Sequence, residues 1–217
     1  MLRKPSLIVA SLTVGMMVSA TVSADIVITK GNGLTQTLVE SSIHYEDFGN
    51  DDIDWPAILS NYEGDTQLGQ VVIALNKQKS QVTCSVLGKG YDLHVVRDSR
   101  GNPIMLPNGL PLIAPAHLRH VVTCTDPSDP LKLSRLNTDG DTPESFSPYS
   151  RESYPCKWAV TEIMYVKAPR LRVGPIDVPG NTGMFAKVTG GTIKAKGVID
   201  VCTGQNVFTS ISGKLLE

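Results

Sequence analysis

Alternation of apolar and polar residues with a period of two is the feature of this sequence that most restricts its fold. In "TIKAKGVIDV" (192–201), the small or apolar residues fall at 193, 195, 197, 199 and 201, and the charged residues fall between them. Successive side chains of a strand point to opposite faces, so this is the pattern of a half-buried strand. Similar runs recur from Gln70 to the C-terminus, including "GMFAKVT" (183–189). We therefore predict an all-β fold, an antiparallel β-sandwich or barrel.

One segment has helical spacing instead. In "DIDWPAILSNYEG" (52–64), the apolar residues recur at i, i+3, i+4 and i+7, an aspartate stands in the N-cap position, and a glycine follows the last apolar residue. These signals predict one short helix at about 55–63.

The segment 125–155 is polar, contains five prolines and has little periodicity. We predict that it is a long polar loop. Cysteines flank it on both sides, so we place it within one domain rather than between two. Shorter turns are predicted at "KGNG" (30–33), at "LGKGY" (87–91) and at Asn108-Gly109, which has the residues of a two-residue hairpin turn.

Four cysteines, Cys84, Cys124, Cys156 and Cys202, predict two disulfide bonds in an exported chain. Sequence alone allows three connectivities. We prefer Cys84 with Cys124 and Cys156 with Cys202, because "QVTCSV" and "VVTCTD" look like neighbouring strands that face one another. This pairing requires Cα atoms about 4.4 to 6.8 Å apart. The alternative, Cys124 with Cys156, would pin the polar loop at its base and leave Cys84 to Cys202.

The first 24 residues have a basic start, an uncharged apolar run and small residues at their end. This is the pattern of a secretory signal peptide, predicted to be cleaved after Ala24. An uncleaved membrane anchor is the alternative, but small and polar residues close the run. We expect a single β-rich domain at 25–217, without a membrane span after cleavage, in a secreted, periplasmic or cell-surface protein.

Charge is distributed unevenly along the chain. The net charge is −1, which does not suggest a nucleic-acid binder. Between Lys30 and Lys77 there are eight acidic residues and no basic ones, whereas the segment 157–217 has a net charge of +4. The ends can face one another within one fold, or they can serve a protein partner or head-to-tail self-assembly.

Histidines offer the only candidates for catalysis, and these are weak. His117 and His120 stand three residues apart in "AHLRH", at the entry to a predicted strand, without a metal-ligand motif or a signalled nucleophile. The common serine-nucleophile, P-loop and dinucleotide-binding motifs are absent from the sequence. We therefore assign no catalytic residue beyond the weak candidates His117 and His120, and we predict no cofactor.

Metal binding has equally weak candidates. Asp47, Asp51, Asp52 and Asp54 supply oxygen ligands that suit calcium, but the last three also fit the start of the short helix, where carboxylates are favourable. "LNTDGDTPE" (136–144) fails the EF-hand pattern, and we interpret it as a polar turn. The cysteine spacings do not suit zinc, because no C-x-x-C or Cys/His pair occurs.

These observations favour an exported, non-enzymatic β-protein that acts as a binding, adhesion or surface-assembly module. One alternative is a secreted hydrolase whose site is built from dispersed residues, with His117, His120 and the acids as the first residues to test. A second alternative is a periplasmic carrier or assembly factor.

Overall fold

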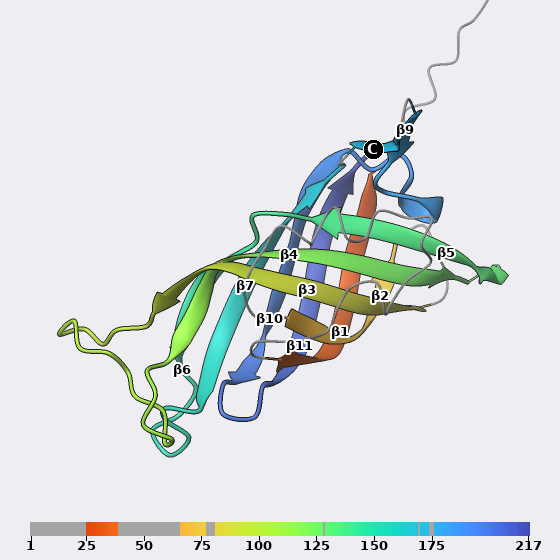
Figure 1. Cartoon of the computed structure of the whole chain (residues 1–217). Coiled ribbons are helices and arrows are strands. Elements are labelled where there is room, and N and C mark those ends of the chain that lie inside the picture. Colours follow the sequence, from red (N-terminus) through yellow and green to blue (C-terminus); the bar gives the residue numbers. More distant parts are fainter. Residues whose placement is uncertain (1–24, 39–65, 77–80, 128, 169, 174–175) are drawn as a thin grey trace, which may run out of the picture.

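The structure is a computed structural model that describes residues 25–38, 66–76, 81–127, 129–168, 170–173 and 176–217. Eight antiparallel strands close into a barrel, which confirms the all-β prediction and selects the barrel (Figure 1). In order around the barrel they are β1 (Ile26–Leu38), β2 (Thr66–Leu75), β3 (Gln81–Val95), β4 (Ile113–Asp126), β5 (Asp129–Thr138), β7 (Lys157–Lys167), β10 (Gly190–Asp200) and β11 (Gln205–Leu216). β11 returns to pair with β1.

Period-two alternation produces the wall of this barrel. On β10, Ile193 and Ala195 are buried in the core while Lys196 is exposed, as the sequence pattern predicts. The inward faces of the other strands contribute further β-branched and aromatic side chains to the same core, among them Ile73, Val122 and Phe208. The core therefore fills the barrel interior.

The predicted polar loop at 125–155 is wrong over most of its length. β5 lies inside it, and so does β6 (Thr142–Pro148), which continues the line of β5 along β7. The pattern was hidden because the inward positions include the short polar residues Ser134 and Thr138, whereas Leu131 and Leu133 point outward and are exposed. Leu136 does lie in the core, but residues 134–138 are all buried, so burial does not alternate with hydropathy along this strand.

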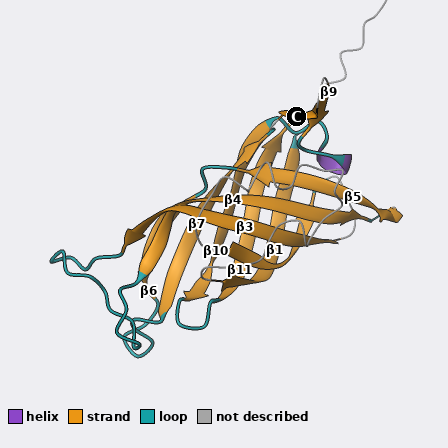
Figure 2. Cartoon of the chain, in the orientation of Figure 1, coloured by secondary structure: helices purple, strands orange, loops and turns teal. Residues whose placement is uncertain are grey.

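Two of the three predicted turns are also wrong. Residues 30–33 lie within β1 and residues 87–91 within β3. Their glycines allow close packing inside a strand: a Cβ on Gly33 would lie 2.5 Å from Cγ1 of Val71. A turn is confirmed at the third position, but not its two-residue form. Gly109 has a φ of 81° and its N–H donates to the carbonyl of Leu106, so Pro107 and Asn108 are the central residues. Among the described residues, the longest loops gather at the end of the barrel that carries this hairpin (Figure 2).

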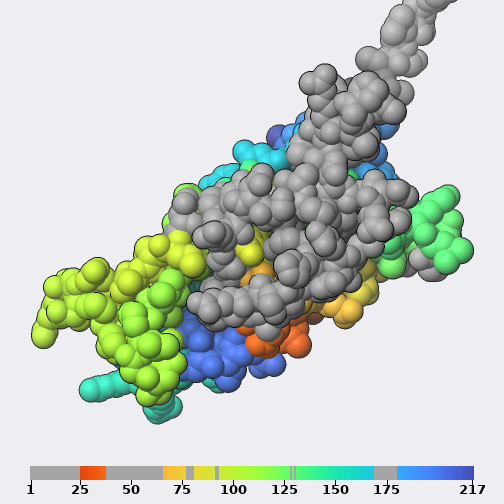
Figure 3. Space-filling view, viewed as in Figure 1, coloured from red at the N-terminus to blue at the C-terminus, as the bar shows by residue number. Residues whose placement is uncertain are grey.

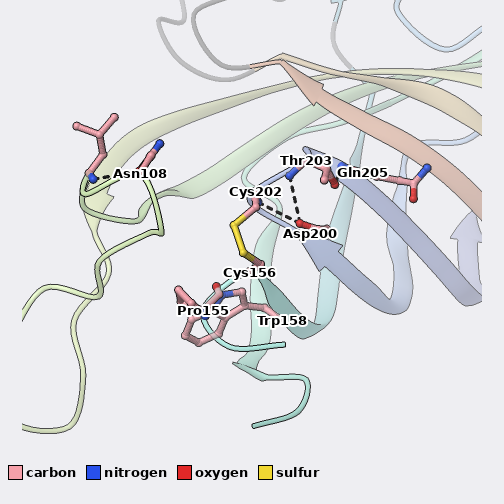
Figure 4. Close-up of a disulfide and its surroundings, with 9 residues drawn as sticks. Asn108, Pro155, Cys156, Trp158, Asp200, Cys202, Thr203 and Gln205 are labelled. Atoms are coloured by element: carbon pink, nitrogen blue, oxygen red, sulfur yellow. Dashed lines mark hydrogen bonds between the residues drawn. A yellow bond between two sulfur atoms is a disulfide. The ribbon is translucent and has the colours of Figure 1, made fainter. Parts of the chain in front are cut away.

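Both preferred disulfide bonds are confirmed. Cys84 and Cys124 are paired residues of β3 and β4 inside the barrel, with Cα atoms 3.9 Å apart, slightly closer than expected. Cys156 and Cys202 join the start of β7 to the end of β10 (Figure 4). Beside this second disulfide, Trp158 donates from Nε1 to the carbonyl of Pro155.

A segment between β7 and β10 closes part of the barrel. It contains the hairpin of β8 (Arg170–Val173) and β9 (Ile176–Pro179) and the short 3-10 helix η2 (Gly183–Phe185). The strand predicted at 183–189 is therefore wrong. Phe185 is fully buried in the barrel core, and the N–H of Met184 donates to Oγ of Ser134 on β5.

The two ends of the barrel sheet lie side by side, since β1 pairs with β11 (Figure 3). Lys214 on β11 forms an ion pair with Asp25, with 2.7 Å between Nζ and Oδ2. This ion pair does not involve the acidic run between Lys30 and Lys77, so the interpretation of the charged ends stays a prediction. All eight acidic residues of that run, the predicted helix at about 55–63 and the predicted signal peptide at 1–24 lie outside the described residues. Within the described part of the chain, no helix has the length and hydropathy of a membrane-spanning segment.

Candidate functional site

A polar cluster interrupts the apolar interior of the barrel. His120 on β4 is only 2% exposed and points inward. Its neighbour on β3 is Gly88, whose neighbour on β2 is Gln67. A Cβ on Gly88 would lie 2.5 Å from Cδ2 of the His120 ring, so the absence of a side chain there leaves room for the imidazole. Oε1 of Gln67 reaches across β3 to within 2.9 Å of His120 Nε2.

Both ring nitrogens of His120 have partners. Nδ1 lies 2.7 Å from Oδ2 of Asp141, and Nε2 faces the amide oxygen of Gln67. An amide oxygen accepts hydrogen bonds, so in this arrangement Nε2 donates to Gln67. Nδ1 is the nitrogen that faces the acidic residues.

Asp141 is fully buried at the junction of β5 and β6. Its backbone exchanges two hydrogen bonds with Leu118 of β4, each 2.9 Å long, and so fixes its position against that strand. Its carboxylate accepts from the hydroxyl of Thr138 and, at 2.8 Å, from the N–H of Tyr165. Two backbone and two side-chain hydrogen bonds thus hold Asp141 beside His120.

Glu162 is the third member of the cluster and the least satisfied. It occupies an inward position of β7 and is 6% exposed. Its Oε1 lies 4.0 Å from His120 Nδ1 and accepts no hydrogen bond from any described residue. We refer to His120, Asp141 and Glu162 as the buried cluster.

The electrostatics of the buried cluster favour bound protons. Burial raises the pKa of Glu162 to about 7; the attraction of His120 opposes this shift and the repulsion of Asp141 adds to it. Burial by itself would lower the pKa of His120, but its hydrogen bond to Asp141 and the charges of Glu162 and Asp141 outweigh burial and raise it. Both groups of the buried cluster therefore keep their protons up to a higher pH than they would in water.

A cavity of about 50 Å³ adjoins the buried cluster. Its walls are mainly apolar, with Ile193 and Phe208 among them, and its polar lining includes Gln67, His120 and Glu162. One water needs about 10–15 Å³ of such space, so the cavity has room for a few waters or a similarly small ligand.

The arrangement can bind a proton or a cation, and it lacks the pattern of an activated nucleophile. A catalytic histidine needs a hydroxyl, thiol or substrate within reach of one nitrogen, yet here both nitrogens of His120 bond to Asp141 and Gln67. In contrast, one ligand-type atom from each member of the buried cluster lies within 4.8 Å of the others. Imidazole and carboxylate groups are the usual ligands of transition metals.

The structure separates the two predicted histidines. His120 lies in the barrel, whereas His117, three residues earlier on the same strand, lies on the opposite face. They cannot act together. The weak calcium candidates Asp47, Asp51, Asp52 and Asp54 lie outside the described residues.

Sequence reasoning missed Asp141, Glu162 and Gln67 as site residues. The segment that contains Asp141 was interpreted as a polar turn, and a turn at Gly140 does carry it, with φ of 74°. Glu162 gave a usable signal: it shares the inward phase of "KWAVTEIMYVK" with Trp158 and Val160, where an acid is unexpected. Comparisons of this chain with protein-family models, curated proteins and solved structures found no match.

Proposed function

We propose that this chain is an exported, non-enzymatic binding protein that holds a small ligand inside the barrel, against Glu162. One observation carries the proposal: the buried Oε1 of Glu162 accepts no hydrogen bond from any described residue and lies at the edge of a cavity. Of the functions that the sequence suggests, this observation favours ligand binding.

The energetics of burial support a ligand at this position. A buried carboxylate without a compensating partner costs several kcal/mol, which a purely structural core would avoid with an apolar side chain. Strongly shifted acids in cavities are therefore candidates for functional groups. The pKa of Glu162, raised to about 7 by burial, fits this description.

Export is supported by the cysteine chemistry. Both disulfides are compatible with an extracellular or otherwise oxidising compartment, and no described cysteine is free. The secreted or periplasmic location and the signal peptide remain part of the proposal. The hydrolase alternative gains no support from the described residues, because both ring nitrogens of His120 are engaged by Asp141 and Gln67. Self-assembly through charged ends stays a prediction, tested by sedimentation at low and high salt.

Native mass spectrometry tests the proposal directly. The full chain would be expressed in a host with an oxidising export route, purified without denaturant, and weighed before and after denaturation. We expect excess mass that denaturation removes. Ala195 is the β10 partner of Glu162 and lines the cavity, so A195L should reduce the bound mass.

A control sits on the outer face of the same strand. Val198 is three residues from Ala195 and pairs with Ala159, so V198L lengthens a side chain away from the cavity and should keep the bound mass. E162Q, which preserves shape, should lose it. Absence of excess mass in the wild-type chain, or equal mass in A195L and V198L, contradicts the proposal.

A further inference from the structure

We infer that the ligand of this barrel is a divalent transition-metal ion of the Zn²⁺ type, coordinated by His120 Nδ1 and by carboxylate oxygens of Asp141 and Glu162. The inference rests on the proposed function and assigns the chemical class of the ligand.

The ligand atoms come from three neighbouring elements that the sheet holds in place. His120 is on β4, Asp141 follows β5, and Glu162 is on β7; one ligand-type atom from each lies within 4.8 Å of the others. One imidazole and two carboxylates form a set that borderline transition metals accept. Calcium and magnesium prefer six or more oxygen ligands, which this set does not supply.

The position of His120 Nδ1 suits a cation shared by the three groups. Nδ1 lies 2.7 Å from Oδ2 of Asp141 and 4.0 Å from Oε1 of Glu162. A proton on Nδ1 satisfies the pair with Asp141 alone, whereas a metal ion in its place also engages Glu162.

The surrounding groups resemble the support that metal ligands require. Metal-bound histidines usually donate their second nitrogen to a carbonyl or carboxylate, and ligating carboxylates are themselves hydrogen-bonded. Here Gln67 accepts from His120, and Asp141 accepts from Thr138 and from the N–H of Tyr165. These contacts orient two ligands before any ion arrives.

The charges of the ligands indicate that the ion is divalent. With neutral imidazole, the buried cluster carries two negative charges, from Asp141 and Glu162. A divalent ion neutralises both and supplies the missing partner of Glu162 Oε1. Burying a carboxylate whose charge is neutralised by a neighbouring cation costs far less free energy than burying an unpaired carboxylate.

Coordination requires small side-chain movements. Nδ1 and Oδ2 must separate from 2.7 Å, and Glu162 Oε1 must approach from 4.0 Å, so that each lies about 2.0–2.2 Å from one ion. The adjoining cavity of about 50 Å³ has space for a water in the fourth position. An open fourth position is usual in zinc sites with three protein ligands.

Calorimetric titration tests this assignment. The full chain, purified with both disulfides intact, would be stripped with a chelator, dialysed, and titrated with ZnCl₂. We expect one ion per chain. Outer-shell partners alone change metal affinity by about 10–100-fold, so loss of a direct ligand in E162Q should weaken binding by about 100-fold or more.

E144Q is the matched control, because Glu144 is a half-exposed residue of β6 that pairs with Lys194 outside the barrel. It should bind zinc as the wild type does. Circular dichroism would establish that both variants are folded, and Co²⁺ substitution should give visible absorption bands that are altered in E162Q. One-to-one binding that is lost in E162Q and kept in E144Q supports the inference.

Two results would overturn the inference. Folded wild-type chain that binds no zinc eliminates the metal, and zinc binding that is equal in E162Q and E144Q places the ion elsewhere. If the excess mass in the native spectrum persists and still depends on Ala195 and Glu162, only the metal assignment fails. If the excess mass is also missing, the proposed function fails with it.

Discussion

Gly88 and His120 face one another across β3 and β4, and the ring of the histidine occupies the space that a side chain on residue 88 would fill. The same gap lets Gln67 reach the ring from β2. A glycine within a strand ordinarily weakens it. Here its lack of a side chain is what allows the buried cluster to form.

Alanine at position 88 should therefore disturb the cluster. Because a Cβ there would lie 2.5 Å from His120 Cδ2, G88A forces the ring to move or the strands to separate. Overpacking of this kind costs about 1–3 kcal/mol, measurable by urea unfolding, and zinc affinity should fall as well. Gly190 on β10 is the control, since a Cβ there meets nothing within 4 Å; G190A should change stability by less than about 0.5 kcal/mol. Equal effects of the two substitutions would contradict the role given to Gly88.

Metal-free protein should lose stability as the pH rises. The folded-state pKa of Glu162, about 7, lies above its ordinary 4.5, and that of His120 lies above its ordinary 6.5. Both groups hold protons in the folded state that the unfolded chain has released, so their contribution is complete at low pH and lost as the pH passes their folded pKa values. With chelator present, the urea midpoint should be lower at about pH 8 than at about pH 5. E162Q should reduce this difference and E144Q should not; an undiminished difference in E162Q would argue against titration of Glu162.

Removal of one disulfide should destabilise the barrel strongly. The bonds join residues 40 and 46 positions apart, and loops of that size correspond to about 4 kcal/mol each in the chain-entropy model. C84A/C124A should lose more than C156A/C202A, because Cys84 and Cys124 are also buried in the core. Urea unfolding of the two double variants checks the order. In exported wild-type protein, alkylation under denaturing, non-reducing conditions should add no mass, and any modified thiol would contradict the pairing.

Asn181 should be a strong determinant of stability although it lies in no strand. Its Oδ1 accepts from the backbone N–H of Asn137, and its Nδ2 donates to the carbonyls of Lys167 and Val188. N181A removes the hydrogen-bond partner of each of these backbone groups, and each buried group left unsatisfied costs about 1–3 kcal/mol of stability. The exposed Asn32 on β1 provides the control, N32A. A thermal midpoint for N181A equal to that of N32A would contradict this structural role.

Sequence patterns predicted the parts of this fold that depend on local alternation. The inward phase of 193–201 was correct because Lys194 and Lys196 mark the outer face clearly. β5 escaped prediction because its burial does not follow its hydropathy: Ser134 is buried beside η2, and Leu131 faces solvent. Which residues of β5 are buried depends on packing between elements, so it cannot be predicted from the sequence of β5 alone.

The candidate site was less predictable than the fold. His120 was recognised as a candidate, but its partners lie 53, 21 and 42 residues away, and only barrel closure brings them together. The pairing with His117 was misleading, because residues three apart meet on a helix and diverge on a strand. Periodicity shows which face a residue occupies, but it does not show which other strand that face will meet.

The pairing of β1 with β11 also constrains how the barrel is made. The first strand of the barrel hydrogen-bonds with the last, so its partner does not exist until the ribosome has completed Leu216. Until then the growing sheet has two open edges, which are prone to pair with other chains. Closure of the barrel therefore waits for β11, and until β11 has been made this edge of β1 is open to other chains.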